Sequence, residues 1–301
     1  MRFMPFCDLH AHSNASDGTD TPANLARAAS RAGLAALAIT DHDTTAGHEE
    51  CRAACDTLGV EFIPGVELSG DARALLSSLH LPHVGQLHIL GLFVDSASPE
   101  LSSLCLRLRQ GRDERVPRML ASLASLGMPL SMDDVRAIAG DAVLCRPHVA
   151  FAMVARGYVS SKQEAFDRYI GLGGPAYVEK DDGAAADCID AIHASGGLAV
   201  LAHPIHLNCR SNNDLRRVLS HLRDLGLDGV EVLHSDQPAE FSHTVAALAR
   251  DMGLAPSGGS DYHGSAKPMA LGSQRVPADV LEELRARRPV MKKAPGSVPG
   301  A

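Results

Sequence analysis

Two histidines and an aspartate near the amino end of the chain have the types and spacing of metal ligands. In the stretch DLHAHSNASDGTD, residues 8–20, His10 and His12 are one residue apart, and Asp17 follows in a turn that contains glycine. Side chains two residues apart on an extended chain point to the same side, so both imidazoles can face one cation. Mixed imidazole and carboxylate ligands suit Zn, Mn or Fe, whereas an all-oxygen site suits Mg or Ca. One such pair is a weak signal, and further ligands must come from elsewhere.

More histidines and acids occur within or directly after other apolar, strand-like runs. They are His42, Glu67, His88, His203, His234, Asp261 and His263. Asp261 and His263 repeat the spacing of His10 and His12. The carboxylate of Glu67 has two oxygens and could bridge two metal ions. Six other histidines lack this pattern and are predicted to be surface or packing residues: His48, His80, His83, His193, His221 and His243.

The elements that must position these residues alternate between strands and helices. Strands are predicted at residues 6–10, 34–40, 60–68, 86–94, 176–180, 198–204, 228–235 and 254–264. The helix after the first strand has Thr21 as a suitable N-cap, Pro22 in its first turn and Gly33 at its end. Repeated strand–helix units imply parallel strands with helices outside, and about seven strands favour a distorted barrel over an open sheet. The carboxyl ends of barrel strands open on one face, where the candidate ligands would converge.

A segment between the two strand-containing parts is predicted to be helical. Residues 99–174 contain amphipathic runs and no clear strand. We therefore predict an α/β barrel in two parts, residues 1–98 and 176–301, with an α-helical insertion at residues 99–175. The stretch 69–86 is predicted to be irregular, and Asp43 is predicted to cap the helix that follows it.

The composition limits the classes of function. The chain has 301 residues, a formal net charge of −8, 4% aromatic residues and no Trp, so neither charge nor base stacking supports binding of long DNA. No run has the roughly 18 apolar residues of a membrane helix, and the amino end lacks the apolar segment of a signal peptide. Seven scattered cysteines without a CxxC pair indicate reduced thiols. We therefore expect a cytoplasmic protein with no membrane partner.

Seven motifs in a fixed order run along essentially the whole chain. They are DLHAHSNASDGT, AITDHDT, PGVE, LHILG, RPH, LAHP and GGSDYHG. Together they resemble the PHP (polymerase and histidinol phosphatase) family of metal-dependent phosphoesterases, in particular the branch with a helical insertion that includes nucleoside 3′,5′-bisphosphate phosphatases. The resemblance implies a distorted (β/α)7 barrel and a trinuclear metal site. It also implies a small phosphorylated nucleotide as substrate and divalent cations as cofactors, Mn first, with Zn, Fe or Mg as alternatives.

The same resemblance implies the ligands of each metal ion. One ion would be held by His10, His12, Glu67 and Asp261. A second would share Glu67 and take His88 and His148, the latter from RPH in the insertion. The third would be held by Asp17, His42 and His263. In the stretch before His88, His80 or His83 could compete for the second ion.

The predicted reaction is hydrolysis of a phosphomonoester by a metal-bound hydroxide. Divalent metals neutralise phosphate oxygens and lower the pKa of bound water towards ~7, so Glu67 and Asp261 would act through the metals they hold. His203 on the same rim is predicted to bind phosphate or protonate the leaving oxygen, with support of a ligand as the alternative. Further candidate substrate contacts are Arg146, Lys180, His206 and Arg210.

The sequence leaves other functions open. Some proteins similar to this family shorten RNA from its 5′ end, so a 5′-to-3′ exoribonuclease acting on short RNA is one alternative. Barrels with an HxH pair also hydrolyse C–N bonds, but no strand-end lysine suggests the bridging carbamate often used in that chemistry. A non-catalytic metal-binding PHP module is a third, although every expected ligand position is filled. We favour release of the 3′-phosphate from nucleoside 3′,5′-bisphosphates such as adenosine 3′,5′-bisphosphate, which leaves AMP.

Overall fold

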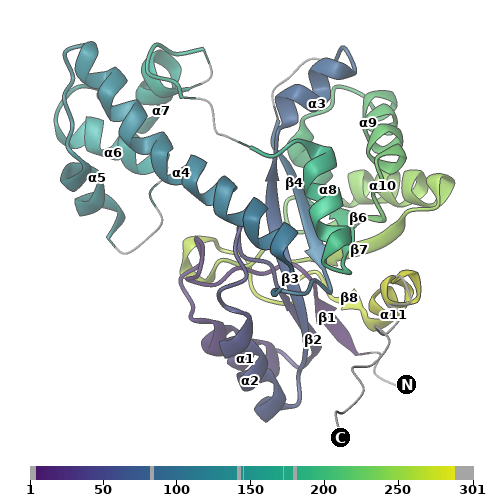
Figure 1. The fold of residues 1–301 in the computed structure, drawn as a ribbon. Coiled ribbons are helices and arrows are strands. Elements are labelled where there is room, and N and C mark those ends of the chain that lie inside the picture. The colour runs from purple at the N-terminus through teal and green to yellow at the C-terminus, as the bar shows by residue number, and fades with distance from the viewer. Residues whose placement is uncertain are drawn as a thin grey trace, which may run out of the picture.

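An eight-stranded, nearly closed barrel forms the centre of the protein. The computed structural model describes residues 5–81, 85–140, 144, 146–171, 173–178 and 182–288. Its strands are β1 (Phe6–Asp8), β2 (Leu34–Ile39), β3 (Glu61–Gly70), β4 (Leu87–Leu92), β5 (Leu198–Leu201), β6 (Gly229–His234), β7 (Ala255–Gly259) and β8 (Val276–Pro277). They pair in the order β7-β6-β5-β4-β3-β2-β1-β8 (Figure 1). A hydrogen bond of 3.2 Å from the backbone N–H of Leu9 to the carbonyl of Gly258 joins the two sides, which confirms the predicted α/β barrel class.

The direction of β4 corrects the prediction that the barrel strands are parallel. β4 runs antiparallel to both β3 and β5, and β8 runs antiparallel to β1. His88 near the start of β4 therefore pairs with Ser69 near the end of β3. This reversal brings the beginning of β4 to the face where the parallel strands end, which we call the barrel rim. His88 reaches the rim for this reason.

Helices cover the outside of the barrel. They are α1 (Pro22–Arg31), α2 (His48–Leu58), α3 (Ala72–Ser78), α8 (Ala185–Ala194), α9 (Asn212–Asp224), α10 (Ala239–Met252) and α11 (Ala278–Arg287). The start of α1 is confirmed, because the hydroxyl of Thr21 accepts a hydrogen bond from the backbone N–H of Asn24 at 3.2 Å and Pro22 occupies the first turn. Short 3-10 turns follow β5 and β7, at Pro204–Leu207 and Gly264–Ala266.

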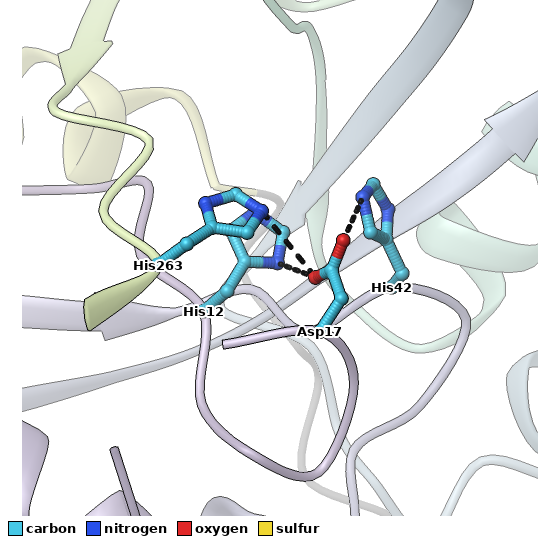
Figure 2. Close-up of side chains that lie close together, drawn as sticks. All are labelled: His12, Asp17, His42 and His263. Atoms are coloured by element: carbon cyan, nitrogen blue, oxygen red, sulfur yellow. Dashed lines mark ion pairs between the residues drawn. The ribbon is translucent and has the colours of Figure 1, made fainter. Parts of the chain in front are cut away.

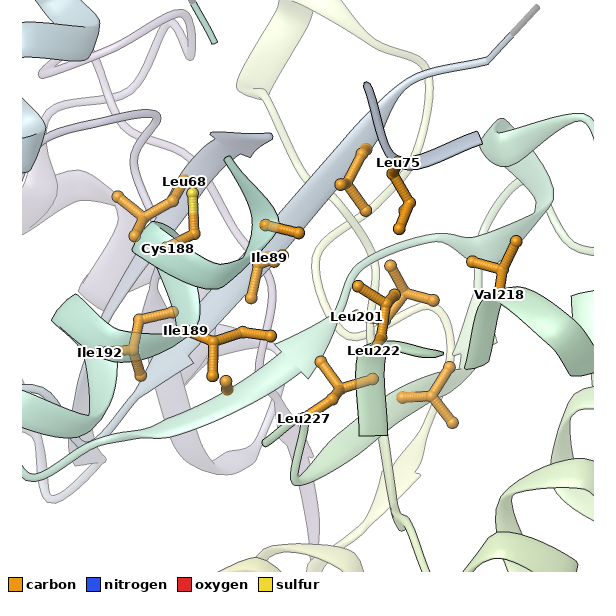
Figure 3. Packing of buried hydrophobic residues seen from close by; sticks show 14 of the residues in the cluster. Leu68, Leu75, Ile89, Cys188, Ile189, Ile192, Leu201, Val218, Leu222 and Leu227 are labelled. Carbon is orange, nitrogen blue, oxygen red and sulfur yellow. The ribbon is translucent and has the colours of Figure 1, made fainter. Parts of the chain in front are cut away.

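The strands are buried on both faces because alternate residues serve two different cores. Ala36, Leu90 and Val200 belong to the core that fills the barrel. On the opposite face, Ile89 and Leu201 pack with Cys188, Ile189 and other apolar residues of the outer helices (Figure 3). This two-sided burial explains why β2, β4 and β5 read as nearly continuous apolar runs.

Between β4 and β5 the elements that the structure describes are helices, joined by turns. These elements are α4 (Pro99–Ser125), α5 (Met132–Ala139), α6 (Arg146–Ala155), α7 (Lys162–Ala165), the π-helix η1 (Phe166–Ile170) and α8. Figure 1 shows the long α4 leading from the barrel to α5, α6 and α7, which lie to one side. Met119, Leu123 and Met153 belong to a separate hydrophobic core of this region. The domain division at residues 98 and 175 stays a prediction.

Two predictions about local structure were wrong. The stretch 69–86 is not irregular throughout, since β3 continues to Gly70 and α3 follows, with Asp71 as its N-cap. Residues 176–178 of the predicted strand 176–180 form no strand, and residues 179–180 lie outside the described part of the chain.

Asp43 was also predicted wrongly as a helix cap. The N-cap of α2 is Gly47, without a side-chain hydrogen bond. The carboxylate of Asp43 instead accepts hydrogen bonds from the N–H and hydroxyl of Ser69, both at 2.9 Å, and from the Arg112 guanidinium at 2.6 Å. Asp43 thus ties the end of β3 to α4.

The sequence also predicted reduced thiols and no membrane helix. None of the described helices is long and apolar enough to cross a membrane. The cysteines within the described ranges are free thiols, and most are buried.

Candidate metal centre

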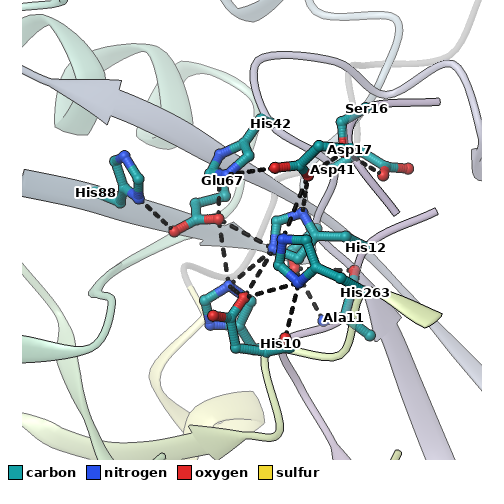
Figure 4. Close-up of polar contacts among 12 residues, drawn as sticks. His10, Ala11, His12, Ser16, Asp17, Asp41, His42, Glu67, His88 and His263 are labelled. Carbon is teal, nitrogen blue, oxygen red and sulfur yellow. Dashed lines mark hydrogen bonds and ion pairs between the residues drawn. The ribbon is translucent and has the colours of Figure 1, made fainter. Parts of the chain in front are cut away.

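Eight predicted ligands meet at the barrel rim, and we call them the ligand cluster. They are His10, His12, Asp17, His42, Glu67, His88, Asp261 and His263. They come from the ends of β1, β2, β3 and β7, from the turn after β1 and from the start of β4 (Figure 4). The strand geometry thus gathers residues that are as far apart as 253 positions in sequence, His10 and His263, within one site.

Glu67 lies at the centre of the ligand cluster. Its Oε1 atom is 2.8 Å from Nδ1 of His88. Its Oε2 atom is 3.3 Å from Nε2 of His10, 3.1 Å from Nε2 of His12 and 3.2 Å from Nδ1 of His42. Each carboxylate oxygen therefore faces a different set of imidazoles, as expected of a carboxylate that bridges two cations.

His10 is held in the orientation that a metal ligand needs. Its Nδ1 atom donates a hydrogen bond to Oε1 of Glu231 at 3.0 Å, so the lone pair of Nε2 faces the cluster. Nε2 of His10 lies 3.1 Å from Nε2 of His12 and 3.4 Å from Oδ1 of Asp261. Glu231 is fully buried and also accepts the backbone N–H of His203 at 2.7 Å.

Asp17 joins three imidazoles on one side of the cluster (Figure 2). Its Oδ1 atom is 3.3 Å from Nε2 of His263 and 3.7 Å from Nδ1 of His12, and its Oδ2 atom is 3.8 Å from Nε2 of His42. Nδ1 of His263 donates to the carbonyl of Asp261 at 2.8 Å, which directs Nε2 of His263 towards Asp17.

The turn that carries Asp17 is fixed by Asp41. Oδ1 of Asp41 accepts the N–H of Ser13 and the hydroxyl of Ser16, both at 2.7 Å, and Oδ2 accepts the hydroxyl of Ser13 at 2.7 Å. Gly18 follows Asp17 because a Cβ there would lie 2.5 Å from the carbonyl oxygen of His12. The serines and glycine of this motif therefore set the position of Asp17.

The charges in the cluster attract cations. Burial would lower the pKa of His10, but the carboxylates of Glu231, Glu67 and Asp261 raise it well above its usual value. Burial acts likewise on His12, but hydrogen bonds with Asp261 and Glu67 raise its pKa to about 10. Burial would raise the pKa of Glu67, yet the surrounding imidazoles hold it well below its usual range. The carboxylates therefore remain ionised and require positive charge beside them.

Several residues at the rim have an uncommon backbone conformation. The φ angles of Asp43, His203 and Asp261 are 53°, 24° and 52°. A positive φ at residues other than glycine costs roughly 1–3 kcal/mol and persists only where surrounding contacts impose it. Here the contacts include the hydrogen bond from the N–H of Asp261 to the carbonyl of His10 at 2.9 Å.

The donor atoms fit divalent transition-metal ions. Nε2 of His10 and Nε2 of His12 are 3.1 Å apart, too close for both to carry a proton or for both to direct a lone pair at the other favourably, and buried Nδ1 of His12 makes no hydrogen bond to the described residues. A cation that accepts several lone pairs would resolve this crowding. Among the described residues, four groups have possible ligand atoms within 4.8 Å of one another, and three of them lie in the ligand cluster: His10, His12, Glu67 and Asp261; His12, Asp17, His42 and His263; and His42, Glu67 and His88. The fourth group is His10, Glu231 and His234.

The first group has the residues predicted for the first ion, the second adds His12 to those predicted for the third ion, and the remaining one has Glu67 and His88 of the predicted second set. The assignment of these residues to particular ions stays a prediction. His148, predicted for the second ion, lies near the start of α6 and is half-buried. It belongs to no group of possible ligands among the described residues, and its role stays a prediction. His80 is likewise outside these groups, and His83 lies outside the described residues.

A cavity of about 500 Å³ opens over the ligand cluster, within the ~300–1,000 Å³ typical of small-molecule sites. Of the predicted substrate contacts, Arg146, His203 and His206 line it. Arg210 is exposed and does not line it, and Lys180 lies outside the described residues.

Comparison with known proteins decides the family. The model of the PHP domain matches residues 8–128. A 5′-3′ exoribonuclease from Haemophilus influenzae is 34% identical over 256 residues, which cover 85% of this chain and 89% of that protein. The chain belongs to the PHP domain family. A 3′,5′-nucleoside bisphosphate phosphatase from Chromobacterium violaceum is 35% identical, with coverage of 86% of this chain and 88% of that protein.

The solved structures agree with this assignment. A structure described as a metal-dependent phosphoesterase from Bifidobacterium adolescentis has 31% identity and a TM-score of 0.75, and the match covers 95% of this chain and 98% of that one. The metal-dependent phosphoesterases of the PHP family are hydrolases, so the chain belongs to a family of hydrolytic enzymes.

The structure adds residues to this PHP site that the sequence interpretation missed. Glu231 orients His10, and Asp41 fixes the turn of Asp17. Lys267 lines the cavity, with its ammonium 2.6 Å from Oδ2 of Asp261. A charged residue inside the apolar run GVEVLH was an available signal for Glu231, because a buried carboxylate requires a partner. Nothing comparable in the sequence around Lys267 indicates that it would line the cavity.

Close packing between β7 and the HxH motif gives a first testable prediction. A Cβ at Gly259 would lie 2.4 Å from Cβ and 2.5 Å from N of His10, so Gly259→Ala must displace this ligand. We expect metal affinity to fall at least ~10-fold and the unfolding free energy to fall by about 1–3 kcal/mol. Titration with Mn2+ against a competing chelator measures the first effect, and urea unfolding of the metal-free protein measures the second.

Ser257→Ala, on the same strand, is the matched control, because it removes an atom from β7 instead of adding one. Ser257→Ala should retain the affinity of the unchanged protein. Unchanged metal binding in Gly259→Ala would show that the position of His10 does not matter.

Proposed function

We propose that the protein is a metal-dependent phosphomonoesterase that releases the 3′-phosphate of nucleoside 3′,5′-bisphosphates, for example converting adenosine 3′,5′-bisphosphate to AMP. The observation that carries the proposal is the meeting of buried imidazole and carboxylate groups with guanidinium groups around one cavity. A phosphate monoester is a dianion, and its hydrolysis requires positive charge around its oxygens. The similarity to the bisphosphate phosphatase from C. violaceum supports this choice of substrate.

We assign two or three divalent cations, with Mn2+ as the first choice, to the three groups of the ligand cluster. When bound, such cations neutralise phosphate oxygens and lower the pKa of a coordinated water. The contribution of the chain is to hold the ligands in place: Glu231 fixes the tautomer of His10, and the carbonyl of Asp261 fixes that of His263.

His203 is assigned to the substrate side of the site. Its Nε2 atom lies 2.8 Å from Oε1 of Glu67, and burial lowers the pKa of His203 to about 4. A neutral imidazole is a poor proton donor at pH 7 and carries one N–H, which here faces the Glu67 carboxylate. With Glu67 bound to a cation, this N–H would be free to donate to a phosphate oxygen, and we favour that role over protonation of the leaving group. The apolar side chains of Val116, Leu144 and Phe166 also line the cavity and suit a nucleoside.

Metal removal and a substrate panel test the proposal. Chelation should reduce phosphate release from adenosine 3′,5′-bisphosphate at least ~1,000-fold, because the metal ions that neutralise the dianion and activate water are then absent, and added Mn2+ should restore it. Elemental analysis before and after chelation counts the ions, and Zn2+, Fe2+ and Mg2+ are compared with Mn2+. Failure to release phosphate from any nucleotide ester with any of these metals would contradict the proposal.

A 5′-to-3′ exoribonuclease is the second candidate, favoured by the similarity to the H. influenzae enzyme. A short RNA with a 3′ label decides between the two functions. Progressive loss of 5′ nucleotides, faster than release of phosphate from the bisphosphate, would favour the exoribonuclease. Metal binding without either activity would indicate a non-catalytic module.

A further inference from the structure

A smaller pocket adjoins the main cavity. It has a volume of about 120 Å³ and shares Gln86, His88, Arg115 and Arg146 with the main cavity. This volume is well below the ~300 Å³ at which sites for whole small molecules begin, so the pocket suits a single chemical group. Because Nδ1 of His88 lies 2.8 Å from Oε1 of Glu67, the pocket begins directly beside the ligand cluster.

The walls of this pocket are rich in guanidinium groups. Arg73 from α3, Arg115 from α4 and Arg146 from α6 line it, together with the carboxylates of Asp71 and Asp182. Among the described residues of the lining, three cationic groups thus face two anionic ones. Asp71 already accepts the backbone N–H of Ala74 at 2.8 Å as the cap of α3. The described part of the lining therefore has an excess of positive charge.

Two of these guanidinium groups lie near the same aromatic ring and are partly out of solvent. The guanidinium carbons of Arg115 and Arg146 lie 5.8 Å and 5.9 Å from the ring centre of Tyr177. Burial lowers the pKa of Arg115, and the positive charge of Arg146 lowers it further. The carboxylate of Asp182 on the pocket wall offsets part of this repulsion, and a bound anion would offset more of it.

Arg115 is also oriented before any ligand arrives. Its Nε atom donates a hydrogen bond to the carbonyl of Val178 at 3.0 Å, which fixes the plane of the guanidinium group. Arginine binds phosphate through paired N–H groups in this plane, so a fixed orientation reduces the cost of binding.

We propose that the pocket of Arg115, Arg146 and Tyr177 binds the second phosphate of the substrate, the one that is not hydrolysed. The inference rests on the proposed function, because it places the reacting phosphate at the ligand cluster. Its consequence is that Arg115 and Arg146 select molecules with two phosphates over those with one. The residues responsible come from the helical region between β4 and β5, and that region would set substrate specificity.

Paired substrates test the inference. With Mn2+ present, kcat/KM is measured for adenosine 3′,5′-bisphosphate and for adenosine 3′-monophosphate. We compare kcat/KM for the bisphosphate divided by kcat/KM for the monophosphate. In Arg115→Met this ratio should fall about 30-fold, the effect of losing a charge-assisted phosphate contact. Arg115→Lys should restore part of the ratio, because it keeps the charge without the paired N–H groups. Arg146→Met should resemble Arg115→Met.

The matched control is Arg107→Met, an exposed arginine on the same helix that pairs with Asp187 away from this pocket. It should leave the ratio unchanged. Equal losses for both substrates in Arg115→Met would overturn the inference while leaving the phosphatase proposal intact.

A binding measurement separates the inference from the proposed function. Calorimetry of the Mn2+-loaded protein with AMP and with adenosine needs no turnover. Weaker binding of AMP, but not of adenosine, in Arg115→Met supports the pocket even if no ester is hydrolysed. AMP binding that is the same in Arg115→Met and the unchanged protein would overturn it.

Discussion

Glu67→Gln is expected to lower kcat/KM for the preferred phosphate ester by at least ~1,000-fold and to lower the metal content of the protein. Glutamine keeps the shape of the side chain but removes the charge and one of the two oxygens. Both oxygens face imidazoles, and Glu67 belongs to two of the ligand groups. Changes in residues that merely support ligands lower metal affinity or activity about 10–100-fold. Loss of a ligand that two groups share should lower them more.

The measurement combines steady-state kinetics at saturating Mn2+ with elemental analysis after dialysis. Glu49→Gln makes the same chemical change at an exposed position of α2 and should have no effect on either quantity. A Glu67→Gln protein that keeps its full metal content and works within ~10-fold of the unchanged protein would remove Glu67 from the centre of the site.

The barrel was predictable because its signals are local. Apolar runs of strand length alternate with amphipathic helical segments, and ligand-type residues follow the runs. The direction of β4 was not predictable in this way. β3 and β4 are joined by a segment that contains α3, and a helix between two strands usually returns the chain for a parallel pair. Here the helix occurs within an antiparallel connection, which no local pattern indicates.

The site was predictable for residues at strand ends and less so for the residues that support them. His10, Glu67 and Asp261 could be placed together because strand ends of a barrel share a rim. Asp43 was misassigned because an acid before a helix resembles an N-cap, whereas its partners, Ser69 and Arg112, are distant in sequence. Contacts of this kind depend on packing between elements, and one sequence does not reveal them.

Glu231 is the missed residue with the largest expected effect. Oε1 of Glu231 accepts from Nδ1 of His10, and Oε2 accepts from the backbone N–H of His203. In Glu231→Gln, one of these donors must face an amide NH2 group in place of an oxygen. The buried donor without an acceptor should cost about 1–3 kcal/mol of unfolding free energy.

Metal affinity and kcat/KM of Glu231→Gln should both fall about 10–100-fold, because His10 loses the contact that fixes its tautomer and orientation. Chelator competition, urea unfolding and kinetics over a range of Mn2+ concentrations provide the measurements, and Glu240→Gln at an exposed position of α10 is the control. Glu231→Gln keeps all four ligands of one set, His10, His12, Glu67 and Asp261. Excess Mn2+ should therefore restore much of the activity of Glu231→Gln, but not that of Glu67→Gln. Lower stability with unchanged metal affinity would mean that Glu231 serves folding alone.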